Sequence, residues 1–174
     1  GGSVYAIAVD DNYVYIGGYT TNKAYKLNKT NLSKVAESDG YGGSIEAIAV
    51  DNNYVYIGGA TTKKVYKLNK SNLSKVAESI DYGGFIRAIA VDDDYVYVGG
   101  TTTNKAYKLN KTNLSKVTES DSYGGTIYAI AIDDNYVYIG GYGSNFKVFK
   151  LNKSNLSKVA ESDGYGGSIY AIAV

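Results

Sequence analysis

The sequence predicts an all-β fold, a β-propeller made of four-stranded antiparallel blades with four repeats per chain. Three observations support this prediction. An apolar tetrad recurs every 41 or 42 residues along the 174-residue chain. Each interval contains four short segments with the composition of β-strands, and these segments become more polar from first to last. Four strands in about 40 residues is typical of a propeller blade. The tetrads are Ala6–Val9, Ala47–Val50, Ala88–Val91, Ala129–Ile132 and Ala171–Val174.

The first half of each unit contains two predicted strands. In the first unit, Ser3–Val9 is short and mostly apolar, as expected for a strand at a crowded central axis. The next strand, Tyr13–Ile16, is aromatic and β-branched. The polar turn Asp10–Asn12 separates them, because Asp and Asn favour tight reversals. Gly17 and Gly18 are expected to begin a loop.

The second half of each unit contains two more polar strands. Lys23–Leu27 is predicted as the third strand and Leu32–Glu37 as the fourth, with the turn Asn28–Asn31 between them. Lys34, Glu37 and Ser38 suit the fourth strand to the wet outer rim of a propeller. A Gly-rich stretch, 38–43, leads to the next unit. An all-β solenoid is the alternative, but its coils are usually shorter and lack this gradient.

These boundaries place blades at about 3–41, 44–82, 85–123 and 126–165, with an extra inner strand at 166–174 that nearly duplicates residues 1–9. Each blade needs only one inner strand, so one copy is in excess. It could be displaced, pair with another chain, or belong to a longer array of repeats.

The repeat resembles that of PQQ-like propellers and their YVTN-type relatives. The resemblance lies in Val14–Gly18, a short loop, and then Lys23–Asn28. It implies a propeller fold but no cofactor, because the blade-docking tryptophan of the quinoprotein dehydrogenases is absent and no cofactor-binding residue can be matched. The chain has no Trp.

Ring closure is expected to involve self-association. The two alanines of each inner tetrad permit close approach of the blades, which suits a ring of many blades with a small angle for each. Two chains of four blades would form an eight-bladed ring as a homodimer, the commonest oligomeric state. An open array would leave apolar faces and strand edges exposed.

The composition excludes several classes of function. Lys plus Arg is 18 against 17 Asp plus Glu, so the net charge of +1 gives no electrostatic basis for nucleic-acid binding. The chain has no Cys and no His, which excludes thiolate chemistry and most zinc and proton-transfer sites. No apolar run is long enough for a membrane span. We expect no cofactor, no metal and no enzymatic activity.

Candidate binding residues are those that differ between otherwise near-identical units. One variable position precedes each inner tetrad and holds Tyr5, Glu46, Arg87, Tyr128 and Tyr170. Near a propeller axis these side chains could bind a small polar ligand through charge-assisted and stacking contacts. Alternatively, Glu46 and Arg87 only neutralise each other.

A second variable position follows each glycine pair and includes Tyr19 and Tyr142. Aromatic rings there could stack on sugars, with Asn22, Asn104 and Asn145 adding hydrogen bonds; the alternative is loop variation without function. The Asp-rich turns could in principle bind Ca²⁺, but three consecutive turn residues rarely supply enough ligands, so a purely structural turn is expected.

Two functions therefore follow from the sequence. The first is a non-enzymatic binding or interaction module that recognises a glycan or a protein through one rim. The second is a purely structural repeat scaffold, recently duplicated or engineered, that has no ligand.

Overall fold

The computed structural model describes residues 2–143 and 146–174 and has the predicted all-β architecture. Four antiparallel sheets of four strands follow one another along the chain, each with its strands in sequence order. No α-helix occurs in the described residues. The first sheet contains β1 (Val4–Val9), β2 (Tyr13–Gly18), β3 (Tyr25–Asn28) and β4 (Lys34–Glu37), and the second β5 (Ile45–Val50), β6 (Tyr54–Gly59), β7 (Tyr66–Asn69) and β8 (Lys75–Glu78). The third contains β9 (Ile86–Val91), β10 (Tyr95–Gly100), β11 (Tyr107–Asn110) and β12 (Lys116–Glu119), and the fourth β13 (Ile127–Ile132), β14 (Tyr136–Gly141), β15 (Phe149–Asn152) and β16 (Lys158–Glu161).

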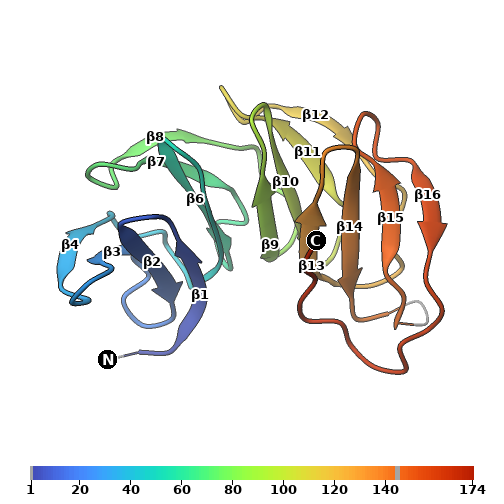
Figure 1. Cartoon of the computed structure of the whole chain (residues 1–174), viewed down its shortest axis with the longest axis horizontal. Helices are drawn as coiled ribbons and strands as arrows, with labels where there is room; N and C mark the ends of the chain where they lie inside the picture. Colours follow the sequence, from blue (N-terminus) through green and yellow to red (C-terminus); the bar gives the residue numbers. More distant parts are fainter. Residues whose placement is uncertain (1, 144–145) are drawn as a thin grey trace.

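The four sheets fan out as an open arc of propeller blades. The last strand of each sheet lies at the outer margin, and the first strands lie toward the middle (Figure 1). Consecutive first strands contact one another, and each also contacts the second strand of the preceding sheet. The three hydrophobic clusters are built from residues of adjacent sheets, so the apolar core lies between the blades.

The glycine pairs belong to the second strands, which corrects the expectation of a loop at Gly17 and Gly18. β2 continues through both glycines, which pair with β1, and neighbouring atoms leave no room for a side chain at either position. A Cβ on Gly17 would lie 2.5 Å from Cγ2 of Ile45 on β5, and one on Gly18 would lie 1.9 Å from the carbonyl oxygen of Ser3. Gly17 therefore lets the next blade approach closely, and Gly18 lets the start of β1 in its own sheet approach.

The third and fourth strands begin two residues later than predicted. At the start of the third segment, the Ser38 hydroxyl accepts the hydrogen bond of the Ala24 backbone N–H at 2.9 Å, in place of a ladder carbonyl. Before the fourth strand, Leu32 has a φ of 55° and belongs to the turn rather than to the strand. Its counterparts Leu73, Leu114 and Leu156 share this left-handed conformation.

The C-terminal segment 166–174 forms no strand, which corrects the predicted extra inner strand. The segment lies where the first strand of a fifth sheet would lie: Ile169 and Ile172 pack on Gly140 as Ile45 and Ile48 pack on Gly17. A strand needs a ladder partner, and no second strand lies beside this segment in the described residues. We call residues 166–174 the tail.

The outer strands are polar and exposed, in agreement with the predicted gradient. On the first sheet, Glu37 accepts hydrogen bonds from Lys23 and Lys34, each at 2.6 Å. These two bonds lower the pKa of Glu37 to about 2. Within the described residues no helix has the length and apolar character required to traverse a lipid bilayer.

Candidate functional site

The variable residues of the inner strands meet around one cavity. The pairing of each first strand with its second strand skips one residue, as between Val4 and Ala6 in β1. A residue left unpaired in this way is a β-bulge, which can redirect a side chain. The skipped positions and their counterpart in the tail line a cavity of about 290 Å³: Tyr5, Glu46, Arg87, Tyr128 and Tyr170.

Glu46 and Arg87 form an ion pair across adjacent sheets, from Oε2 of the carboxylate to Nη1 of the guanidinium. Ser44 donates a further hydrogen bond to Glu46 Oε1 at 2.9 Å. The two charges therefore neutralise each other in the absence of a ligand. The Nε of Arg87 is buried and has no hydrogen-bond partner among the described residues.

The aromatic side of this cavity is formed by Tyr128 and Tyr170. Their rings are stacked with centroids 5.1 Å apart and an interplanar angle of 24°. Tyr5 and Tyr170 are both more than half exposed. The arrangement can offer ring faces and a charged pair to a small polar molecule.

The second set of variable residues does not join this site. Tyr19 and Tyr142 belong to loops of the first and the fourth sheet, are exposed, and do not line the cavity. The ring of Tyr142 contacts that of Phe146 edge-on at 6.0 Å. Asn145 lies outside the described residues.

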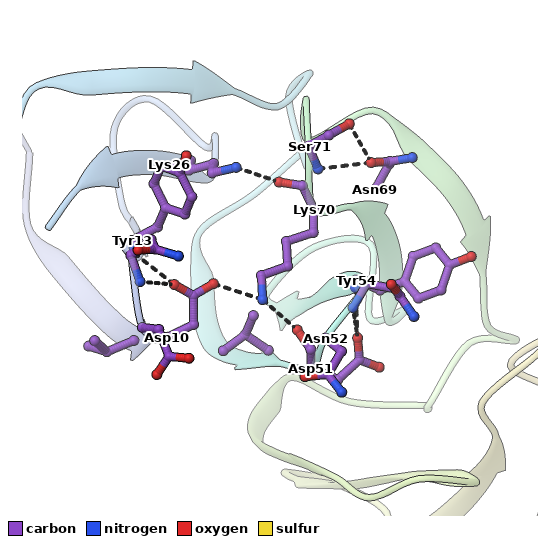
Figure 2. A pocket seen from close by; sticks show the side chains of 14 residues that line it. Asp10, Tyr13, Lys26, Asp51, Asn52, Tyr54, Asn69, Lys70 and Ser71 are labelled. Atoms are coloured by element: carbon purple, nitrogen blue, oxygen red, sulfur yellow. Dashed lines mark hydrogen bonds and ion pairs between the residues drawn. The ribbon is translucent and has the colours of Figure 1, made fainter.

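The Asp-rich turns form polar interfaces between neighbouring sheets. Lys70 Nζ on the second sheet lies 2.8 Å from Asp10 Oδ2 on the first and donates to the Asp51 backbone carbonyl at 2.8 Å. Lys26 Nζ on the first sheet donates in return to the Lys70 carbonyl at 2.9 Å and lies over the Tyr13 ring. Figure 2 shows these bonds at a cleft of about 680 Å³. The same ion pair recurs as Lys111–Asp51 and Lys153–Asp92.

The electrostatics of these interfaces follow from burial and hydrogen bonding. Burial alone would raise the pKa of Asp10, but bonds from Lys70, Asn12, Tyr13 and Tyr15 outweigh it and hold that pKa well below its ordinary value. Burial lowers the pKa of Lys26. The Asp10 carboxylate therefore stays charged, with its oxygens fully used within the protein.

These turns are consequently structural. Asp10 Oδ1 accepts from the backbone N–H groups of Asn12 and Tyr13 at 2.9 and 2.7 Å, and Oδ2 accepts from the Tyr15 hydroxyl at 2.9 Å. In the part of the chain that the structure describes, no group of three or more acidic side chains is placed to bind a metal ion.

The sequence prediction missed the lysines of these interfaces. They occupy one position in every unit, between an asparagine and a threonine or serine: Lys29, Lys70, Lys111 and Lys153. Only the Thr or Ser after the lysine varies in this turn, so retention does not single the lysine out, and its positive charge is the one signal that could have identified it.

The fold places the chain among repeat proteins of β-propeller type. No protein-family model and no curated protein matches the sequence. Solved structures of two computationally designed proteins are similar. Ika8 has a TM-score of 0.85 at 16% identity, covering 99% of this chain and 52% of that chain. Ika4 has a TM-score of 0.74 at 18% identity, covering 87% of this chain and 91% of that chain. The chain thus spans about half the length of Ika8.

Proposed function

We propose that this chain is a non-enzymatic structural module: an arc of four blades that forms an eight-bladed ring with a second copy. One observation carries the proposal. The contacts that join neighbouring sheets are repeated at all three internal interfaces, and the two ends of the arc expose the same groups without their partners.

The apolar part of each internal interface includes a leucine from the turn before the outer strand. Leu73 of the second sheet is fully buried in a cluster with Tyr15 and Ala24 of the first. Its counterpart Leu32 has no preceding sheet and is 60% exposed. Val4 and Ile7 of β1 are exposed for the same reason.

The charged part shows the same complementarity. Lys29 has no carboxylate partner among the described residues, whereas its counterparts Lys70, Lys111 and Lys153 each have one. At the other end of the arc, the Asp133 carboxylate has no lysine partner in the described range, in contrast to those of Asp10, Asp51 and Asp92. A second copy would bring Lys29 to Asp133 in the geometry of the internal pairs.

The comparisons with solved structures are consistent with a structural scaffold. The similar solved structures are computationally designed proteins, and one of them is about twice as long as this chain. We also propose a relationship to PQQ-like and YVTN-type repeats, on the basis of Val14–Gly18 and Lys23–Asn28.

The test is the mass of the chain in solution, measured by light scattering and analytical ultracentrifugation. We expect a dimer of the 18.6 kDa chain. Leu32→Ala should weaken the dimer, and so should Lys29→Glu. The double variant Lys29→Glu/Asp133→Lys, which exchanges the two charges, should restore association. Val35→Ala is the matched control, because Val35 is also an exposed aliphatic residue but lies on the outer strand β4. A chain that stays monomeric at high concentration would refute the ring.

A second candidate function is the binding of a glycan or another small polar ligand at the axial cavity. The paired charges of Glu46 and Arg87 and the stacked rings of Tyr128 and Tyr170, which line one cavity, favour it. A glycan array is the measurement: binding that Arg87→Ala abolishes would support this site. Binding that is lost instead with Tyr19→Ala and Tyr142→Ala would favour a site on the loops that carry these residues. The absence of any binding would favour the purely structural function.

A further inference from the structure

The segment between consecutive sheets contains a central tyrosine that anchors the next sheet. Tyr41 is 1% exposed, its hydroxyl donates to the Lys64 carbonyl at 2.6 Å, and its ring meets that of Tyr66 edge-on at 4.9 Å. Tyr82 and Tyr123 make the same contacts with the third and fourth sheets. We call these residues linker tyrosines.

The chain contains a fourth linker tyrosine that has nothing to anchor. Residues 162–168 repeat residues 38–44 letter for letter, so Tyr165 corresponds to Tyr41. Tyr165 is nevertheless 77% exposed. The tail that follows is already seated on the fourth sheet, through Ile169 and Ile172 against Gly140 and a bond from Ile169 N–H to the Gly141 carbonyl at 3.1 Å.

The first sheet has no linker tyrosine packed against it. Tyr25 is the counterpart of Tyr66 but has no aromatic partner among the described residues. The tail differs from β1 and the residues before it only at Ile169, which replaces Val4. The tail can therefore pair with β2 in the register that β1 uses, in which Val9 lies opposite Val14.

We propose that two copies of this chain join by strand exchange: the tail of one copy becomes the inner strand of the first sheet of the other, and β1 is displaced. This inference rests on the proposed ring and specifies how it closes. Exchange places Tyr165 against Tyr25 and the Lys23 carbonyl, and so reproduces the complete internal interface. Retention of β1 would instead expel the tail from Gly140 and leave Tyr165 without a partner. Exchange of identical segments is a low-cost route to dimers.

Two pairs of cysteines test this, in a chain that contains no native Cys. In Val14→Cys/Val174→Cys, exchange brings the two thiols of different copies opposite each other. We expect oxidation to give a covalent dimer on a non-reducing gel. Val174→Cys alone controls for random cross-linking. An intramolecular disulfide would mean that the tail closes a ring within its own chain, which would overturn the exchange.

The second pair locks β1 in place. Val9→Cys/Val14→Cys, oxidised at high dilution, holds β1 on β2, and we expect dimer formation to weaken by roughly tenfold or more, equivalent to about 1.4 kcal/mol, and to return on reduction. A locked chain that dimerises as tightly as the reduced one would refute exchange and leave the ring intact. A monomeric parent chain would refute both.

A substitution of the linker tyrosine provides an independent readout. Tyr165→Ala should weaken the dimer while the unfolding of the separate chain stays the same, because Tyr165 is exposed there. Tyr165→Phe keeps the ring and should retain most of the association. Dimers of equal strength from all three chains would count against the role of Tyr165.

Discussion

At the scale of single residues, the interfaces depend on a carboxylate that serves two purposes. Asp10 closes its own turn with one oxygen and reaches Lys70 of the next sheet with the other. The Tyr15 hydroxyl, buried between the sheets, donates to the same carboxylate. Local turn geometry and the docking of blades are thus coupled through one side chain.

This coupling predicts loss of stability in acid. Burial would raise the pKa of Asp51, but hydrogen bonds, led by the one from Lys111, lower it. The pKa values of Asp10 and Asp92 are also lowered by hydrogen bonds that outweigh burial. A carboxyl group whose pKa is lower in the folded chain stabilises the fold above its unfolded pKa of about 3.9, and this contribution disappears as the pH falls through the folded value. The free energy of unfolding should therefore be level from neutral pH to about pH 5 and fall below about pH 4.

The control uses the repeat itself. Asp51→Asn should cost about 2 kcal/mol at neutral pH and flatten the acid limb of the profile, measured by urea denaturation. Asp11→Asn should change little, because Asp11 is exposed and the second unit already has Asn52 there. Equal profiles for the two variants would contradict the role given to the Asp51 carboxylate.

At the scale of elements, the second strand of each sheet sets the spacing of the blades. Its first glycine faces two isoleucines of the next inner strand at Gly17, Gly58 and Gly99, and two isoleucines of the tail at Gly140. The strand propensity lost at a glycine is offset by the close packing that its missing side chain permits.

Gly58→Ala should therefore destabilise the fold by about 1–3 kcal/mol, because its Cβ would lie 2.6 Å from Cγ2 of Ile86 and overpack the interface. Gly40→Ala is the matched control: no atom lies within 4 Å of a Cβ there, so its effect should be small. Thermal unfolding monitored by circular dichroism measures both. Similar losses in the two variants would argue against packing as the cause.

The strands could be predicted from the sequence more readily than the contacts between neighbouring sheets. The Ala-Ile-Ala-Val tetrad and the Tyr-Val-Tyr-Ile run indicate strands through composition alone, and the variable residue before the tetrad is the one that the bulge turns into the cavity. The Asp10–Lys70 pair was not predictable. In a repeat, pairing of Asp10 with Lys29 of its own unit or with Lys70 of the next produces the same sequence pattern, so periodicity cannot distinguish them.

At the scale of the whole molecule, stability should be distributed over three equivalent interfaces rather than over one core, as in other repeat proteins. The first sheet exposes Leu32 and Lys29, which have no preceding sheet to contact, and the fourth sheet presents the Asp133 carboxylate without a lysine from a following sheet. Closure of the ring through a second copy would give both ends the environment that every internal blade already has.

The leucine turns carry this difference into the backbone itself. A left-handed conformation costs a residue with a side chain roughly 1–2 kcal/mol. Burial of the side chain offsets this cost at Leu73, Leu114 and Leu156. Leu32 has the same conformation, with a φ of 55°, but its side chain is exposed to water. The first sheet of a separate chain therefore carries a backbone strain that no burial offsets. Association would leave the conformation of Leu32 unchanged but would bury its side chain, and this burial would offset the strain.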